Sequence, residues 1–581
     1  MCGIVGYIGR REAAPLIVEG LKKLEYRGYD SFGVATLENG IHLAKYQGRI
    51  SEKAGTASQL KGKIGIGHTR WATHGVPNDT NAHPHTDCTG TVAVVHNGII
   101  ENYAELKRDL QSRGHTFRSE TDTEVIVHLI EDEHIQKKDL LASVQAVIPR
   151  LKGSFAILVI AAGEEKIIAA RYASPLVIGI GDGEFFAASD MTPVIEHTER
   201  AIFLEDGDIV SLSKKKMEIF HNGKSVSRQV ELIDWSLEDV KKGGFAHYML
   251  KEIYEQPQAF YNTIRSVSRE TLPAMVREAQ TVTVVACGSS YHSGFIFKYL
   301  LEASCGIPVR LEFASEFKYY TPPISGLVIG ITQSGETADT LTALKAAKAS
   351  GCKTLAITNV LGSSVTRLAD ITLYMRAGPE ISVAATKSFI AQLAVLMQIA
   401  NSLADTPHDD MLLQAHKAIE VVLLMDLADA VSVCKDAQSI FYVGRGPFYA
   451  VSLEGALKMK EISYIHAEGY AAGELKHGPF ALLSPETPVI ALCMPGETYG
   501  VMVSNIKEMK ARGAPVIAVG AEGDRELPDI ADIFIAVPKS LPLVQILTSL
   551  VVEQLLAYHT AVALGRDVDK PRNLAKSVTV E

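Results

Sequence analysis

The second half of the chain repeats one pattern, in which a short apolar run is followed by a loop and then by a helical segment. The apolar runs lie at 281–286, 326–331, 354–358 and 371–375, and again at 439–443, 488–494, 515–520 and 533–537. Apolar runs that alternate with helices are typical of a parallel sheet covered by helices. The repeat length of about 150 residues predicts two similar α/β lobes, an arrangement that commonly builds a ligand cleft.

The first 230 residues differ, because their apolar runs are short and turns separate them. We expect strands at 3–8, 64–68, 90–96, 154–160 and 176–180, and one continuous strand at 202–211. A mixed α/β unit rich in sheet follows from this pattern. The charged segment 234–257 contains Gly243-Gly244 and predicts a linker. We therefore place a first domain at 2–232, a linker at 233–257, lobes at 258–405 and 410–565, and a tail at 566–581.

Composition excludes several classes of partner. The 581 residues include 57 basic and 67 acidic side chains, so a net charge of −10 argues against nucleic acid. Seven scattered cysteines without a CxxC pair indicate a reducing, cytoplasmic setting. The start MCGIVGYIG lacks the regions of a signal peptide, and the apolar stretch 388–404 is interrupted by amide side chains. We expect no membrane partner.

Cys2 is the first candidate for chemistry, because loss of Met1 leaves a thiol and a free α-amine on one residue. An α-amine titrates near about pH 7.7–8.0, so it can take the thiol proton and later return it. Position alone favours a buried cysteine in a starting strand. The motifs that follow favour the nucleophile.

Three further motifs bring polar groups to strand ends. Arg70 in HTRWATHG can hold a carboxylate through a bidentate fork or form an ordinary surface ion pair. Asn97-Gly98 offers a side-chain amide beside a backbone N–H, as an oxyanion hole requires, although Asn-Gly is also the commonest hairpin turn. Asp122 precedes an expected helix, where it either caps the helix or receives a substrate ammonium.

Together with CGIVGYIG and EYRGYDS, these motifs resemble the N-terminal-nucleophile glutaminase domain of class II amidotransferases over residues 2 to about 230. The resemblance implies an αββα fold in which Cys2 attacks the glutamine side-chain amide. It assigns the oxyanion to Asn97 and Gly98, the α-carboxylate to Arg70 and the α-amine to Asp122. The pocket would be lined by Trp71, where ammonia leaves, and by Thr73, His74 and Gly75.

A metal site is an alternative interpretation of part of this region. Metal-type side chains lie close in sequence at His83, His85, Asp87 and Cys88, with His68 and His74 nearby. No HExxH motif or paired-cysteine spacing supports such a site, so we predict no metal. The Gly-rich run 179–183 lacks a strand–helix setting and no GxxxxGK[ST] motif occurs, so we also predict no cofactor.

Two loops of the first lobe, 286–294 and 331–340, follow apolar runs and precede helices. Their hydroxyl and N–H groups suit a phosphate dianion at helix N-termini, although simple helix capping explains one such loop equally well. Here the sequence resembles a sugar isomerase, or phosphosugar-binding, domain. In the second lobe, Lys458 and Glu461 lie three residues apart, which places them on one side of a helix. They either contact neighbouring atoms of one substrate or form an exposed ion pair.

A glutaminase domain, two such lobes and the tail DVDKPRNLAKSVTVE look like the glutamine:fructose-6-phosphate aminotransferase family over essentially the whole chain. The resemblance implies doubly wound parallel-sheet lobes, glutamine and fructose 6-phosphate as substrates, and a homodimer. It assigns ring opening to His477 of the neighbouring subunit, imine formation to Lys576, proton transfer between carbons 1 and 2 to Glu461, and assistance at the 1-hydroxyl to Lys458. Sugar and phosphate binding falls to Ser289, Ser290, Thr332, Gln333, Ser334, Thr337 and Val383.

The chain departs from the family pattern at a few positions. Thr332 replaces a common serine and keeps the hydroxyl, whereas Ala385 replaces a serine that usually touches the sugar and removes a hydrogen bond of about 0.5–1.5 kcal/mol. Phe32 replaces a small residue. The compact linker resembles that of bacterial-type members.

Two other functions fit part of the sequence. A phosphoribosyl amidotransferase would share the glutaminase half but would need a ribose-phosphate and pyrophosphate site in place of the duplicated lobes. A non-catalytic phosphosugar sensor would have no need for Glu461, His477 and Lys576 together.

Overall fold

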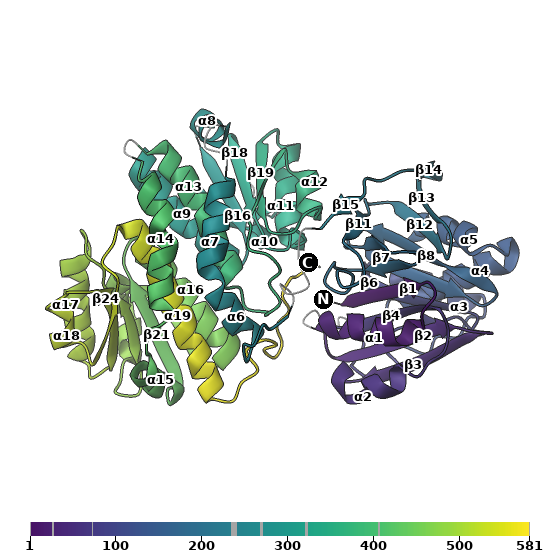
Figure 1. The fold of residues 1–581 in the computed structure, drawn as a ribbon, viewed down its shortest axis with the longest axis horizontal. Helices are drawn as coiled ribbons and strands as arrows, with labels where there is room; N and C mark the ends of the chain where they lie inside the picture. Colours follow the sequence, from purple (N-terminus) through teal and green to yellow (C-terminus); the bar gives the residue numbers. More distant parts are fainter. Residues whose placement is uncertain are drawn as a thin grey trace. The chain divides into compact units, whose positions relative to one another are not determined.

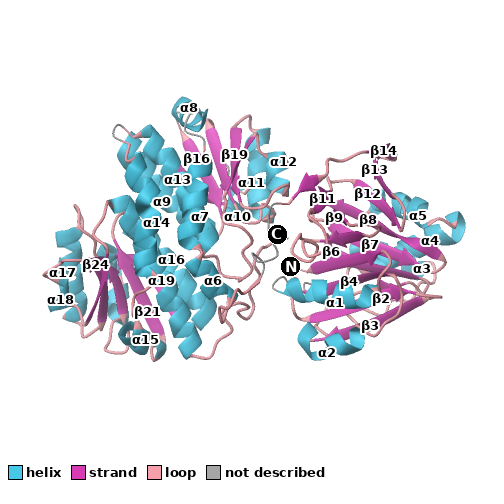
Figure 2. Cartoon of the chain, in the orientation of Figure 1, coloured by secondary structure: helices cyan, strands magenta, loops and turns pink. Residues whose placement is uncertain are grey.

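The computed structural model describes residues 2–25, 28–71, 74–233, 241–267, 271–279, 281–319, 324–404 and 407–579 (Figures 1 and 2). Packing divides the chain into two units. The first comprises residues 1–240 with 362–364 and 577–581, and the second comprises 241–361 and 365–576.

The first unit contains two antiparallel sheets. The eight-stranded sheet has the order β15 (Glu231–Leu232), β11 (Arg200–Phe203), β9 (Val177–Ile180), β10 (Phe185–Ala188), β1 (Gly3–Ile8), β4 (Ile64–Arg70), β2 (Ser31–Leu37), β3 (Ile41–Gln47). The seven-stranded sheet has the order β14 (Lys224–Val226), β13 (Met217–His221), β12 (Asp208–Ser213), β8 (Glu164–Tyr172), β7 (Gly153–Ala161), β6 (Val92–Ile100), β5 (His85–Thr86). The helices are α1 (Ala13–Lys23), α2 (Ile50–Ala57), α3 (Tyr103–Ser112), α4 (Glu124–Lys137), α5 (Leu140–Val147) and η2 (Ile148–Arg150).

These elements form the expected αββα layers. One buried cluster joins Ile4 and Ile66 of the first sheet to Leu158 of the second, so the two sheets pack face to face. On the outer face of the first sheet, Gly67 leaves room for α1, because a Cβ there would come within 2.3 Å of the Ile17 side chain. Another cluster packs α4 and α5 against the outer face of the second sheet.

The continuous strand expected at 202–211 is wrong. The chain leaves β11 at Phe203, turns, and enters β12 at Asp208 in the other sheet. The turn is closed by a hydrogen bond from Asp208 N to Glu205 O (3.0 Å), and Gly207 adopts a φ of +89°, which favours glycine. The prediction joined the apolar runs on either side of the polar segment 205–208, and this segment is the turn.

The second unit contains two five-stranded parallel sheets, as expected. Their orders are β17 (Val309–Phe313), β16 (Val282–Ala286), β18 (Leu327–Ile331), β19 (Lys353–Thr358), β20 (Ile371–Tyr374), and β22 (His466–Ala471), β21 (Ser439–Gly444), β23 (Val489–Leu492), β24 (Val516–Ala521), β25 (Ile533–Val537). The two orders are equivalent, which confirms two similar lobes.

Helices cover both sheets of the second unit. They are α6 (Tyr248–Tyr254), α7 (Gln256–Ser266), α8 (Thr271–Glu278), α9 (Ser289–Cys305), α10 (Ala314–Phe317), α11 (Ala338–Ala349), α12 (Ser364–Leu368), α13 (Lys387–Leu403), α14 (Asp409–Val422), α15 (Ala428–Lys435), α16 (Pro447–Ser463), η3 (Ala472–His477), η4 (Pro479–Leu482), α17 (Tyr499–Lys510), α18 (Leu527–Ile530) and α19 (Pro542–Ala563). Figures 1 and 2 show α9, α13 and α16 between the two sheets, where a single apolar cluster joins the lobes.

Helix α19 is long and apolar enough to cross a membrane by length and composition, with a mean hydropathy of 1.3. Its most apolar window is 83% buried inside the protein, against α14, α15 and α16. Burial of this kind is typical of a core helix in a large domain.

Candidate active sites

Cys2 lies directly before β1, beside the end of β4. The register pairs Gly3 with Thr69, so the chain start meets the segment that carries Arg70 and Trp71. The backbone N–H of Trp71 donates to the Cys2 sulfur at 3.3 Å. Burial raises the pKa of the Cys2 thiol, and the Trp71 hydrogen bond only partly opposes this. The thiol therefore needs a base before it can act as a nucleophile.

Asn97 is held with its amide N–H group toward Cys2. Asn97 Nδ2 donates to the Cys2 carbonyl oxygen at 3.0 Å, while Asn97 Oδ1 lies 3.1 Å from His68 Nε2. Burial lowers the pKa of His68 to about 3, so the ring is neutral at physiological pH. An N–H at His68 Nε2 donates to both Asn97 Oδ1 and the His96 carbonyl oxygen, the latter at 2.9 Å. This fixes the orientation of the Asn97 side-chain amide.

Asn97 and Gly98 lie inside β6 and do not form the hairpin turn that their sequence also allowed. Gly98 pairs with Phe155 of β7 and has a φ of +129°. A Cβ at this position would lie 2.0 Å from the Ser154 carbonyl oxygen. Only glycine fits there, because it allows this φ and the close approach of the neighbouring strand.

Arg70 is buried and only partly paired. Its Nη2 donates to the carbonyl oxygens of His74 and, at 3.1 Å, Gly75. Its buried Nη1 has no hydrogen-bond partner among the residues that the structure describes. A buried guanidinium N–H without an acceptor is costly, so the arrangement fits a ligand carboxylate.

The remaining glutamine-site candidates surround these groups. Asp122 is buried, and its Oδ2 accepts from Ile100 N at 2.8 Å, whereas the N-cap residue directly before α4 is Thr123. Trp71 packs edge-on against Tyr29, and His74 against Tyr103. Gly75 has a φ of +77°. Thr73 lies outside the described residues.

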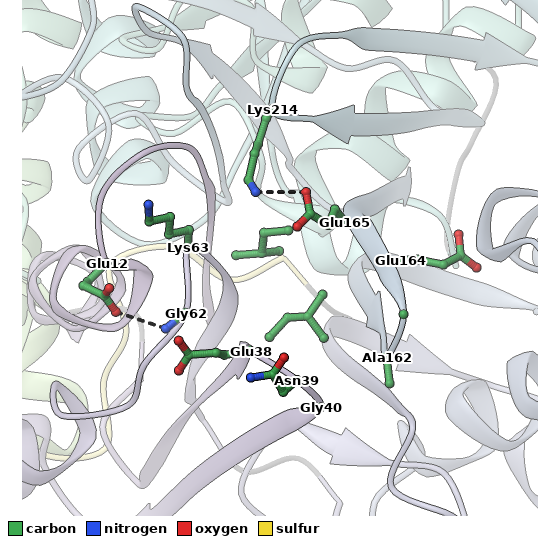
Figure 3. Close-up of a pocket in the computed structure, with 13 residues that line it drawn as sticks. Glu12, Glu38, Asn39, Gly40, Gly62, Lys63, Ala162, Glu164, Glu165 and Lys214 are labelled. Carbon is green, nitrogen blue, oxygen red and sulfur yellow. Dashed lines mark hydrogen bonds and ion pairs between the residues drawn. The ribbon is translucent and has the colours of Figure 1, made fainter.

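A cavity of about 590 Å³ in the first unit belongs to a different place (Figure 3). Its lining includes Leu37 at the end of β2 and Ile64 at the start of β4. Because Ile64 pairs with Ile8 while Thr69 pairs with Gly3, this end of the sheet lies opposite Cys2. None of the predicted site residues that the structure describes lines this cavity.

In the second unit, both predicted phosphosugar loops leave the carboxyl edge of one sheet. Ala286 of β16 pairs with Ile331 of β18, so the loops that follow are adjacent. The hydroxyls of Thr332 and Thr337 form a hydrogen bond of 2.9 Å, and Gly335 N donates to Thr332 Oγ1 at 3.2 Å. Ser334 Oγ accepts from Glu336 N at 3.2 Å, and the Gln333 carbonyl oxygen accepts from Asn359 N at 3.1 Å.

Lys458 and Glu461 form the predicted pair on α16, with Lys458 Nζ 2.6 Å from Glu461 Oε2. Lys458 also donates to Ser289 Oγ of the first lobe at 3.1 Å and lies 3.4 Å from Glu454 Oε1. Burial alone would lower the pKa of Lys458, but the two carboxylates outweigh it and raise the pKa. Lys458 is a buried ammonium at the junction of the two lobes, which contradicts the alternative of an exposed ion pair.

Two further candidates meet the start of α13. Lys576 forms an ion pair with buried Glu380, whose Oε2 also accepts from Ser388 Oγ at 2.6 Å. Ser290 Oγ accepts from Gln392 Nε2 at 2.9 Å. Ser388 and Gln392 are one helical turn apart, so Lys576 and Ser290 lie at the same end of α13.

Val383 and His477 are placed differently. Val383 N donates to the Asp569 carbonyl oxygen at 3.0 Å, which ties the loop before α13 to the C-terminal tail. His477 is exposed at the end of η3. No hydrogen bond joins it to the other described candidates of the sugar site.

Sequence reasoning missed three supporting residues. Glu454 precedes Lys458 by four residues on α16, so helical spacing was a signal for it. Glu380 lies 196 residues from Lys576, and His68 lies 29 from Asn97, so no local pattern indicated either pair. Burial would raise the pKa of Glu380, but Lys576 and Ser388 lower it to about 2.

Family models match both units. A glutamine amidotransferase domain matches residues 68–196, and SIS domains match 275–402 and 435–564. Similar curated proteins from Thermococcus kodakarensis and Pyrococcus horikoshii are 48% identical, and one from Aquifex aeolicus is 46% identical, each over 100% of both chains. All three are named glutamine–fructose-6-phosphate aminotransferase (isomerizing). This chain belongs to that family.

Solved structures agree with this membership. The C-terminal domain of glucosamine-fructose-6-phosphate aminotransferase from Francisella tularensis is 33% identical, with a TM-score of 0.52, over 57% of this chain and 99% of that one. Tagatose-6-phosphate ketose/aldose isomerase from Escherichia coli is 19% identical, with a TM-score of 0.50, over 56% and 95%. The second match supports the fold alone. The chain is therefore an enzyme of the aminotransferase family, with a class II glutamine amidotransferase domain and paired SIS lobes.

One departure from the family pattern has a physical explanation. Phe32 is fully buried in β2 and packs against Tyr46 with ring centroids 5.4 Å apart. Phe32 lies directly opposite Tyr46 of β3 in the strand register, so the two rings form a cross-strand aromatic pair. Nothing in the structure explains the exchange at Ala385.

Proposed function

We propose that the chain converts glutamine and fructose 6-phosphate to glutamate and glucosamine 6-phosphate, the first step of amino-sugar synthesis. The observation that carries this proposal is the meeting of Lys458, Glu461 and Ser289 at the lobe junction, in a chain that also holds Cys2 beside Asn97 and Trp71. A phosphosugar isomerase alone would have no use for the second constellation.

In the glutaminase reaction, the α-amine of Cys2 takes the thiol proton and the sulfur attacks the glutamine amide carbon. Asn97 Nδ2 and the N–H of Gly98 stabilise the oxyanion, as preorganised donors do in a dry site. Arg70 and Asp122 bind the α-carboxylate and α-amine, with Trp71, Thr73, His74 and Gly75 around them. Ammonia leaves, and water hydrolyses the thioester to give glutamate.

In the second reaction, the loops with Ser289, Ser290, Thr332, Gln333, Ser334, Thr337 and Val383 bind the sugar and its phosphate. Lys576 forms an imine with the open-chain ketone, and ammonia that passes internally from the glutaminase site replaces it. Glu461 moves a proton between carbons 1 and 2, and the Lys458 ammonium stabilises charge at the 1-hydroxyl. We place the enzyme in the cytoplasm, which supplies both substrates.

We propose the same division of the chain as before: a glutaminase domain at 2–232, a linker at 233–257, sugar isomerase lobes at 258–405 and 410–565, and a tail at 566–581.

The direct test is incubation of the full chain with glutamine and fructose 6-phosphate, followed by detection of glucosamine 6-phosphate. A phosphoribosyl amidotransferase would release glutamate but form no amino sugar. A phosphosugar sensor would bind fructose 6-phosphate without turning it over. Absence of the amino sugar from active, folded protein contradicts the proposal.

Substitution of Arg70 by lysine tests the carboxylate site. The charge remains but the guanidinium fork is lost, and a hydrogen bond to a charged group contributes about 1.5–3 kcal/mol, so we expect the KM for glutamine to rise by about 10–100-fold. Steady-state glutaminase kinetics measure this. Arg171→Lys, at another buried arginine of the first unit, is the matched control. An unchanged KM for Arg70→Lys would assign Arg70 to holding the His74–Gly75 backbone alone.

We also propose that the enzyme is a homodimer in which His477 completes the sugar site of the neighbouring subunit. The exposed position of His477 fits this arrangement. Mixed dimers of Glu461→Gln and His477→Ala would contain one site with both native residues, so we expect about a quarter of native synthase activity after subunit exchange. Each variant alone should stay inactive. If mixing restores nothing although mixed dimers form, both residues belong to one subunit's site.

A further inference from the structure

Four metal-binding side chains of the first unit converge at one point that the proposed glutamine chemistry does not use. They are Cys88, His115, His128 and Glu131, and their ligand atoms all lie within 4.8 Å of one another. The sequence had grouped Cys88 with His83 and His85. In the structure those two rings instead pack edge-on against each other, with centroids 4.7 Å apart, and Cys88 faces different partners.

Five of the six distances between ligand atoms in this cluster are close to the edges of a tetrahedron around one ion. His115 Nδ1 and His128 Nδ1 are 3.3 Å apart, and each lies 3.1 Å from Glu131 Oε2. Cys88 Sγ lies 3.6 Å from both nitrogens. Tetrahedral zinc with its usual bond lengths to nitrogen, oxygen and sulfur separates such ligand atoms by about 3.3–3.6 Å.

The far nitrogens of both imidazoles face carboxylates. His115 Nε2 lies 2.8 Å from Asp132 Oδ1, and His128 Nε2 lies 3.7 Å from Glu124 Oε1. A neutral imidazole carries one N–H, so a neutral His115 without a metal would leave either Nδ1 or Nε2 facing a carboxylate oxygen with no hydrogen between them. With a metal on Nδ1, the proton sits on Nε2 and points at Asp132, the usual arrangement of metal-bound histidine.

Burial and chain connection also suit a structural ion. The side chains of His128, Glu131 and His115 are 1%, 7% and 8% exposed. Cys88 follows β5, His115 lies between α3 and α4, and His128 and Glu131 are one turn apart on α4. An ion here would join three separate segments.

We propose that Cys88, His115, His128 and Glu131 bind one zinc ion. A thiolate, two imidazoles and a carboxylate form a soft, four-coordinate, closed donor set, which favours Zn²⁺ over Mg²⁺ or Ca²⁺. The charges of thiolate and carboxylate balance the ion. Binding releases the thiol proton and any protons on the two Nδ1 atoms.

The ion would stabilise the segment that carries Asp122. Glu124 accepts from Arg118 N and Ser119 N, each at 2.7 Å, and faces the metal-binding His128. The zinc ligands on α4 therefore fix the helix to which this segment is attached. The role is structural, because no substrate-binding group is a ligand.

The test measures zinc in the full chain, purified without a metal-affinity tag and dialysed against equimolar ZnCl₂. We expect one zinc per chain, and less than about a tenth of that in Cys88→Ser and in His115→Ala. Replacing zinc with Co²⁺ in the unmodified chain should give tetrahedral d–d bands and a thiolate charge-transfer band. This signature needs no variant, so it holds even if a substitution prevents folding.

The control variants are Cys305→Ser, at a cysteine of the second unit, and His134→Gln, at a histidine on α4 outside the cluster. Both should keep full zinc content. Zinc should raise the unfolding temperature of the unmodified chain and of both controls, but not of Cys88→Ser. Absence of zinc from the unmodified chain, cobalt spectra without the thiolate band, or equal zinc content in folded Cys88→Ser would each overturn the proposal.

Discussion

Substitution of Cys2 by alanine is expected to abolish glutamine hydrolysis while conversion of fructose 6-phosphate to glucose 6-phosphate continues. The sulfur is the only atom that forms the thioester, and removal of an enzyme nucleophile costs about 10⁴-fold or more in rate. The second reaction uses Lys458, Glu461 and Lys576, which belong to the other unit. Glutamate release and glucose 6-phosphate formation are measured separately on the same preparation.

Cys305→Ser is the matched control for this experiment, because it removes a thiol of the second unit, whose sulfur lies 3.6 Å from the Ala400 carbonyl oxygen. It should leave both reactions near native rates. Loss of both reactions in folded Cys2→Ala protein would contradict the division of labour between the two units.

Substitution of Glu461 by glutamine is expected to reduce glucosamine 6-phosphate formation by about 10²–10⁴-fold, the usual contribution of a general acid–base group. The amide keeps the shape of the side chain but cannot accept a proton. Binding of fructose 6-phosphate and hydrolysis of glutamine should persist. Product formation, sugar binding and glutaminase activity are each followed in the variant.

Glu508→Gln removes a carboxylate from an exposed ion pair with Lys476 in the same lobe and should leave synthesis unchanged. A loss of less than tenfold in Glu461→Gln, with sugar binding intact, would make Glu461 a structural partner of Lys458. The proton would then have to move through His477 or Lys458.

In the Glu461→Gln variant, removal of the carboxylate charge beside Lys458 has a second consequence. Lys458 would lose one of the two carboxylates that raise its pKa, while Glu454 remains 3.4 Å away. The pKa of Lys458 should therefore fall but stay supported by Glu454. A kinetic effect confined to high pH would point to Lys458, whereas an effect at all pH values points to the missing base.

Local sequence determined much of this protein. Apolar runs followed by loops and helices indicated both parallel sheets, because a strand buried on two faces must be apolar throughout. The three-residue spacing of Lys458 and Glu461 indicated their contact, because the helical period brings such residues together. The motifs around Cys2, Arg70 and Asn97 indicated the family.

Tertiary structure alone decided the contacts between distant segments. Whether Asn97-Gly98 formed a turn or a strand depended on the approach of Ser154, and the orientation of the Asn97 amide depended on His68. The pairing of Lys576 with Glu380 spans 196 residues. Cys88 was visible in the sequence, but its partners lie 27 to 43 residues away on α4 and the loop before it. Hydropathy and helical spacing report only on neighbours within a few turns, so these sites became definite only when packing brought their elements together.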